Sequence, residues 1–117
     1  ELTRDAPYGA KVTFTVDKAQ KGWAAPKLAP WLSQSLQTAS NTFYGKSAMF
    51  TGEGGSIPFM CMLGEMYPST QFVVTGILGP SSNAHGPNEF LHIDFTKKLT
   101  GCVAQILTDH YKARVQA

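Results

Sequence analysis

Charged residues are scarce in this sequence. Of its 117 residues, only 15% are Asp, Glu, Lys or Arg, against about 25% in an ordinary globular domain. A chain of one-domain length normally carries a charged surface that keeps it in solution. The shortage indicates either that other polypeptide covers part of this surface or that the composition simply scatters about the average.

The sequence also lacks the signals of nucleic-acid-binding, membrane and secreted proteins. Its net charge is +2, without a run of basic residues or a basic and aromatic stripe. No stretch approaches the roughly 20 apolar residues of a membrane span, and the polar start at residues 1–7 does not resemble a signal peptide. We therefore expect a cytoplasmic protein with neither a nucleic-acid nor a membrane partner.

Cysteine is limited to two residues, Cys61 and Cys102, which fall in separate predicted helices. In a chain without secretory features, such a pair is better explained as two buried reduced thiols than as a disulfide or a metal site.

A complete metal site is missing from the sequence as well. A catalytic zinc ion needs about three protein ligands, and a two-metal hydrolytic site needs more. The chain has no His-Glu-x-x-His, no Cys-x-x-Cys and no pair of acidic residues beside a buried strand. Either the protein is not a metalloenzyme, or this chain supplies only part of its site.

Three segments have the hydrophobic patterns of β-strands. Residues 11–17 alternate apolar and polar side chains, which is typical of a strand with one wet face. Residues 48–51 predict a short strand, and the near-continuous apolar run at 71–78 predicts a strand buried on both faces. Residues 18–27 contain Gly and Pro without periodicity and predict a connector at a domain boundary.

Three helices are predicted at residues 30–45, 57–66 and 95–113. Pro30 is suited to the first position of the first helix and Gly45 to its end. Its apolar stripe, which we expect to lie on a sheet, consists of Leu32, Leu36, Ala39 and Phe43. Asp94 is expected to cap the last helix, and this role explains the His92–Asp94 pair without a metal. The buried stripe expected on that helix consists of Leu99, Val103, Ile106 and His110.

The order of these elements predicts an α/β fold. From residue 46 onward, two successive strand–helix units imply parallel neighbouring strands joined by right-handed crossovers. Ligands collect beyond the carboxyl ends of such strands. The glycine-rich turn at 52–56 and the loop carrying His85 would therefore face each other on one rim of the sheet.

The glycine-rich turn, Gly-Glu-Gly-Gly-Ser, precedes the second predicted helix. Glycines at a helix N-terminus let backbone N–H groups approach an anion, and the helix dipole favours negative charge there. Ser56 adds a hydroxyl group. The turn fails the phosphate-loop and dinucleotide patterns, and a purely structural turn explains these residues equally well.

His85 lies in a polar loop among Ser, Asn, Gly and Pro residues rather than on an apolar face. An imidazole in this setting is a candidate zinc ligand or general base. Asn88 and Glu89 could orient the ring or the loop. The alternative is a solvent-exposed loop histidine without a function, which is the commoner case.

The turn Gly-Gly-Ser-Ile-Pro at 54–58, followed by the loop at 79–89, resembles the C-terminal part of the M20 family of metallopeptidases. The similarity is greatest to its branch of cytosolic non-specific dipeptidases and carnosinase-like enzymes. It extends over about residues 11–112. It implies the end of the family's lid, or dimerisation, domain at residues 1–18 and the C-terminal portion of its catalytic domain at 19–117.

The resemblance also implies roles for particular residues. His85 would bind one ion of a pair of divalent metals, zinc first and manganese second, and would also line the substrate site. Gly54, Gly55 and Ser56 would contact the bound peptide near its carboxylate end. Gly52 replaces an arginine common in that branch, which leaves the exact subfamily open.

The remaining catalytic groups of the family, including its general base, have no counterpart in these residues. The resemblance thus implies the C-terminal fragment of a peptidase or dipeptidase, inactive alone, that needs the remainder of its own catalytic domain and can form a homodimer through the lid. The alternatives are a small α/β module that binds an anion or another ligand without catalysis, and a non-catalytic scaffold.

Overall fold

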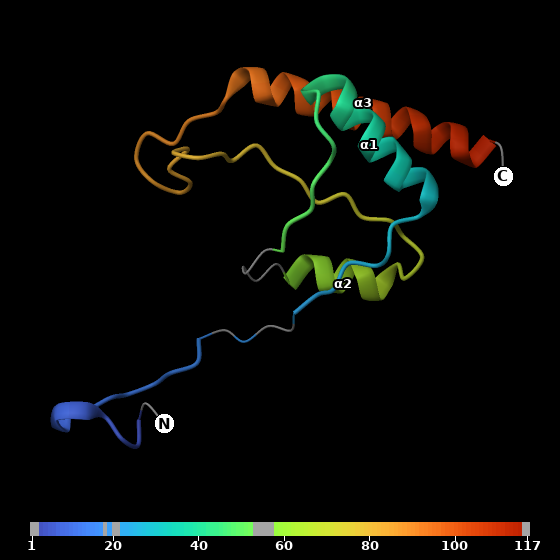
Figure 1. Ribbon diagram of the computed structural model, residues 1–117. Coiled ribbons are helices and arrows are strands. Elements are labelled where there is room, and N and C mark those ends of the chain that lie inside the picture. Colours follow the sequence, from blue (N-terminus) through green and yellow to red (C-terminus); the bar gives the residue numbers. More distant parts are fainter. Residues whose placement is uncertain (1–2, 18, 20–21, 53–57, 116–117) are drawn as a thin grey trace.

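The computed structural model describes residues 3–17, 19, 22–52 and 58–115, which form four helical segments (Figure 1). These are the 3-10 helix η1 (Pro7–Gly9) and the α-helices α1 (Pro30–Tyr44), α2 (Pro58–Met66) and α3 (Ile93–Val115). None of the helices in these ranges is long and apolar enough to cross a membrane.

Helix α1 begins and ends where the sequence predicts. Pro30 occupies its first turn, where a missing N–H costs no hydrogen bond. Gly45 follows the last turn with φ of 68°, a left-handed conformation that glycine adopts without a Cβ clash. Its N–H donates to the Asn41 carbonyl at 3.0 Å. The predicted bounds of α1 are therefore confirmed.

Helix α3 starts earlier than predicted because His92, and not Asp94, caps it. The Phe95 N–H donates to Nδ1 of His92 at 3.2 Å, and the Thr96 N–H donates to the His92 carbonyl at 3.0 Å. Asp94 instead lies in the first turn, where its negative charge faces the positive end of the helix dipole favourably. The predicted Asp94 cap is wrong, although its carboxylate still suits its position.

The core of the described chain lies between α1 and α3, which run antiparallel (Figure 1). The buried apolar residues are Leu32 and Ala39, each 1% exposed, and Cys102, 7% exposed. At one end of the pair, the Trp31 and His110 rings lie 5.2 Å apart between centroids. Helix α1 therefore packs on another helix, and the prediction that it lies on a sheet is wrong.

The predicted buried stripe of α3 is only partly correct. Val103 is 40% exposed, and His110 is exposed although its ring lies against Trp31. The face toward α1 instead passes through Cys102 and the half-buried Ile106 and Asp109. Cys102 and Asp109 thus take the places predicted for Val103 and His110, whereas Ile106 belongs to both the predicted and the observed face.

A polar contact joins the same two helices. Ser35, only 3% exposed, donates from Oγ to Oδ2 of Asp109 at 2.8 Å. Nε2 of Gln105 donates to both oxygens of that carboxylate, at 2.9 and 3.0 Å. These bonds from Gln105 and Ser35 hold the pKa of the Asp109 carboxyl below its ordinary value of 3.8, because they stabilise the ionised form.

Close approach at the other end of the pair depends on a glycine within α3. A Cβ added to Gly101 would lie 2.5 Å from Cε1 of the Phe43 ring. Nearby, the Tyr44 hydroxyl donates to the Phe95 carbonyl at 2.9 Å. Gly101 weakens α3 by its backbone entropy, and in return it leaves room for the Phe43 ring.

The predicted α/β fold is wrong: across the described ranges the regular structure is entirely helical, with no strand and no sheet. Residues 11–17, 48–51 and 71–78 all lie outside helices and strands. A strand exists only where its N–H and C=O groups pair with a neighbouring strand. None of the backbone hydrogen bonds found among the placed residues joins two of these segments.

The apolar run at 71–78 also lacks the burial expected of it. Val73, Val74 and Leu78 are 42%, 58% and 60% exposed, and the run follows an open path between α2 and the His85 loop (Figure 1). Hydrophobicity shows which side chains gain free energy on leaving water. Hydrophobicity does not show which other segment covers these side chains. The apolar pattern alone therefore could not establish that residues 71–78 are buried.

The chain is expanded for its size. Its accessible surface is 9962 Å², whereas a folded monomer of this mass exposes roughly 6,200 Å². Its radius of gyration is 20.0 Å, against roughly 13 Å for a compact domain of this length. Much apolar surface that a self-contained domain would bury therefore remains in water.

Replacing Gly101 by Ala tests the packing of Phe43. We expect Gly101→Ala to lower the free energy of unfolding by about 1 kcal/mol, because overpacking outweighs the gain in helix propensity. In a Phe43→Ala background the same change should instead raise it by about 1 kcal/mol. Urea unfolding of the four proteins measures both effects, and stabilisation in both backgrounds would refute the predicted clash.

The Asp109 cluster predicts a loss of stability in acid. The folded-state pKa is lowered, so the carboxylate stabilises the fold above its unfolded-state pKa. This contribution disappears as the pH falls below about 4. Asp109→Asn should therefore lose less stability than the parent between pH 5 and pH 2, and Ser35→Ala should lie between them. Equal acid sensitivity in the parent and Asp109→Asn, measured by thermal unfolding across this range, would contradict the prediction.

Candidate functional site

The predicted functional histidine lies in a loop that we define as the His85 loop, residues 79–90. Ser82, 4% exposed, joins the two ends of this loop. Its Oγ accepts the Gly79 N–H at 2.9 Å, and its own N–H donates to the Gly79 carbonyl at 3.1 Å. Its carbonyl accepts the Phe90 N–H at 3.2 Å. This buried serine therefore anchors the loop just before α3 begins.

Four residues of the His85 loop have left-handed backbone conformations. Ser81, Asn83, His85 and Asn88 have φ of 66°, 56°, 61° and 58°. Side chains with a Cβ adopt this region at a cost, which is smallest for asparagine. Four left-handed residues in one short loop therefore need hydrogen bonds that offset this conformational cost. The Gly86 N–H donates to the Asn83 carbonyl at 2.9 Å, and the Asn83 side chain donates to the Pro87 carbonyl at 2.6 Å.

His85 itself is exposed to solvent, and its backbone is held in place. Its N–H donates to Oε2 of Glu89 at 3.0 Å. Glu89 thus contacts the main chain of His85 rather than its ring, and Asn88 contributes a left-handed turn between them. The imidazole therefore projects from a constrained turn, where it is open to a partner outside the loop.

The other two histidines have structural positions. His92 caps α3 through Nδ1, and His110 lies against Trp31. Within the described ranges, no group of three or more His, Cys, Asp or Glu residues is placed to hold a metal ion. These residues therefore do not fit a complete metal site. His85 is suited to be one ligand among others that the described chain does not supply.

The predicted substrate residues Gly54, Gly55 and Ser56 lie outside the described residues, so the position of the turn relative to His85 remains a prediction. Helix α2 begins shortly after them, at Pro58. Its end at Met66 agrees with the sequence.

Both cysteines are free, as expected. Burial raises the pKa of the Cys102 thiol, which makes it an unreactive core residue. Cys61 is only half-buried, contrary to expectation. Its S–H donates to Oε1 of Glu65 at 3.7 Å. Neither thiol shows the features of a nucleophile.

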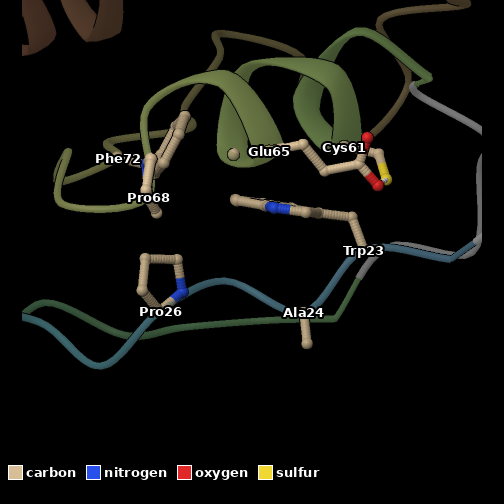
Figure 2. Close-up of a pocket in the computed structure, with 8 residues that line it drawn as sticks. Trp23, Ala24, Pro26, Cys61, Glu65, Pro68 and Phe72 are labelled. Carbon is tan, nitrogen blue, oxygen red and sulfur yellow. Dashed lines mark hydrogen bonds between the residues drawn. The ribbon is translucent and has the colours of Figure 1, made fainter.

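A cavity of about 210 Å³ lies beside α2, in a region that the sequence suggested was a plain connector. Figure 2 shows the indole of Trp23 lying along α2, with Phe72 and Pro68 at one end and Cys61 and Glu65 at the other. The Trp23 and Phe72 rings meet edge to face, with centroids 5.2 Å apart.

Gly64 explains why the indole reaches the helix so closely. A Cβ at Gly64 would lie 2.9 Å from Nε1 of Trp23. The sequence contained one signal for this cavity, a glycine inside a helix, which costs about 1 kcal/mol relative to alanine and often has a packing or functional reason.

The chain is similar to a known peptidase over most of its length. A cysteinylglycine-S-conjugate dipeptidase of Corynebacterium striatum is 26% identical to it over 89 residues, which is 76% of this chain and 20% of that protein. The chain thus spans about a fifth of the length of this relative. No protein-family model matches the sequence. The similarity supports a peptidase, and hence a hydrolase, without specifying its branch.

The contact between Glu89 and the backbone of His85 can be tested by hydrogen exchange. Glu89→Ala removes an exposed hydrogen bond worth about 1 kcal/mol, so the His85 amide should exchange roughly fivefold faster. Exchange followed by NMR measures this directly. Glu65→Ala, which removes an exposed carboxylate from α2, should leave the His85 amide unchanged. An unaltered rate in Glu89→Ala would show that the bond does not hold the loop.

Proposed function

We propose that this chain is the C-terminal part of a metal-dependent dipeptidase or related exopeptidase that hydrolyses a peptide bond near a free carboxylate. The observation that carries the proposal is His85, an exposed imidazole on a constrained loop, in a chain similar to a dipeptidase. The two motifs that resemble M20 metallopeptidases, at 54–58 and 79–89, support the same conclusion.

The contribution of His85 is to bind one divalent metal ion. Two such ions, zinc first and manganese second, would supply the chemistry of a metal-activated water. The described residues offer a single imidazole and no complete donor set. The other ligands and the general base are therefore proposed to come from outside them. Glu89 and Asn88 would keep the His85 backbone in position, which reduces the cost of ordering the ligand when metal binds.

The substrate is proposed to be a dipeptide, with cysteinylglycine S-conjugates, the class in the relative's name, as the first candidates. Its carboxylate would bind at Gly54, Gly55 and Ser56, just before α2. Backbone N–H groups at a helix N-terminus, together with the helix dipole, favour an anion there.

We infer that the 117-residue chain is inactive alone. The chain covers only 20% of the relative, and its surface of 9962 Å² greatly exceeds that expected for its mass. The remainder of the catalytic domain would both complete the site and cover this surface. An intact mass of the native gene product well above 12.7 kDa is the first requirement of the proposal.

Replacing His85 tests the proposal in the native gene product. His85→Ala should lower the metal-dependent hydrolysis of a cysteinylglycine S-conjugate at least about 100-fold, because a metal ligand is lost. The metal content, measured by mass spectrometry of the dialysed protein, should also fall. His110→Ala, at a histidine placed against Trp31, should leave both activity and metal content near those of the parent.

Two results would overturn the proposal. One is unchanged hydrolysis and metal content in His85→Ala. The other is turnover of the dipeptide by the pure 117-residue chain after treatment with a chelator, which would show catalysis without the proposed metals or the remainder of the domain.

A further inference from the structure

His85 occupies a position in its turn that disfavours a histidine. The Gly86 N–H donates to the Asn83 carbonyl at 2.9 Å, which closes a four-residue turn with His85 in the third place. His85 has a φ of 61° there. A type II turn needs a positive φ at this third place and therefore favours glycine or asparagine. A histidine with this backbone is an outlier, and conformational outliers of this kind gather at functional sites.

The side chain of Asn83 spans this turn as well as its main chain. Its Nδ2 donates to the Pro87 carbonyl at 2.6 Å, one residue beyond the Gly86 N–H that its own carbonyl accepts. Two groups of Asn83 therefore bind the chain on the C-terminal side of His85. Glu89 accepts the N–H of His85 itself at 3.0 Å. The backbone of His85 is thus enclosed by two bonds of Asn83 and one of Glu89.

Gly86 provides the space for the Asn83 amide. A Cβ added to Gly86 would lie 2.6 Å from Nδ2 and 2.7 Å from Oδ1 of Asn83. Gly86 does not have a positive φ, so this position does not use the conformational freedom of glycine. Its missing side chain instead lets the Asn83 amide cross the turn. Asn83 and Gly86 therefore act as a pair, which we define as the Asn83 clamp.

We propose that Asn83 is a positioning residue for His85. The Asn83 clamp holds the histidine in its unfavourable place in the turn and so fixes the direction of its Cα–Cβ bond before any ligand binds. A side chain that is already in position loses less conformational entropy on binding. The inference rests on the proposed function, because that function gives the His85 imidazole a metal ion to bind.

Asn83→Asp tests the clamp, because aspartate keeps the size of the side chain and tolerates the left-handed backbone but offers the Pro87 carbonyl no donor. In the metal-free native gene product, the Gly86 amide should exchange roughly fivefold faster, since a lost bond no longer holds the turn closed. Exchange followed by NMR measures this rate. Asn41→Asp, the same change at an exposed position of α1, should leave it unaltered. Equal rates in Asn83→Asp and the parent would overturn the inference.

Gly86→Ala tests whether the two residues of the clamp act as a pair. With Asn83 in place, the added Cβ should displace its amide and accelerate exchange of the His85 N–H roughly fivefold. In an Asn83→Gly background no amide occupies that space, so the same change should have an effect of less than about twofold. Equal effects in the two backgrounds would show that Gly86 does not serve the Asn83 amide and would contradict the clamp.

The affinity for Zn²⁺ separates a positioning role from a purely structural one. Competition with a chromophoric chelator measures this affinity in the native gene product. Asn83→Asp should weaken it about tenfold, as other residues that orient a metal ligand do, and Asn83→Gly, which introduces no charge, should weaken it as much. The midpoint of thermal unfolding of the metal-free protein should stay near that of the parent. An unchanged zinc affinity, or a loss only in parallel with global stability, would refute the positioning role.

Failure of the proposed function gives a different pattern of results. If His85→Ala binds zinc as tightly as the parent, the proposed function is refuted, whereas faster exchange of the Gly86 amide in Asn83→Asp still supports the clamp. If zinc binding depends on His85 but both Asn83 variants bind zinc as tightly as the parent, the positioning inference alone is refuted.

Discussion

The packing of α1 against α3 is the contact on which the rest of the described structure depends. It holds the buried apolar side chains Leu32, Ala39 and Cys102. Small residues make the approach possible: Ala39 and Ser35 on α1, and Gly101 on α3, which leaves space for the Phe43 ring. An interface built from small residues is sensitive to single added atoms, because a filled core has few ways to relax.

This helix pair also determines where the His85 loop ends. His92, the cap of α3, is two residues beyond Phe90, whose N–H closes the loop on the Ser82 carbonyl. The start of α3 is held in turn by the bond from Tyr44 to Phe95. The exit of the loop is thus fixed to the core of the chain, while His85, three residues beyond Ser82, remains exposed. Such a rigid base with an accessible side chain is what a ligand-binding loop requires.

The sequence predicted the parts of this structure that depend on local interactions. Pro30 and Gly45 bound α1 because a proline suits the first helical turn and a glycine suits a left-handed end. The strand predictions were wrong because the backbone of a strand must pair with a second strand, often far away in the chain, and an apolar pattern does not show whether that partner exists. Likewise, the polar setting of His85 was visible in the sequence. The bond from its backbone to Glu89 and the cavity beside Trp23 were not, because both arise from three-dimensional contacts.

The exposed apolar surface and the incomplete donor set have one common explanation. Helix α3 carries a second apolar stripe away from α1, consisting of Val103, Leu107, Tyr111 and Val115, which are 40–70% exposed. A helix with apolar residues on two faces gains free energy from a second neighbour. Among the described residues His85 has no companion ligands. If the proposed remainder of a peptidase domain packs on this chain, it covers the exposed apolar surface and supplies the missing metal ligands. Neither feature then needs a separate cause, and the low content of charged residues follows from the same covered surface.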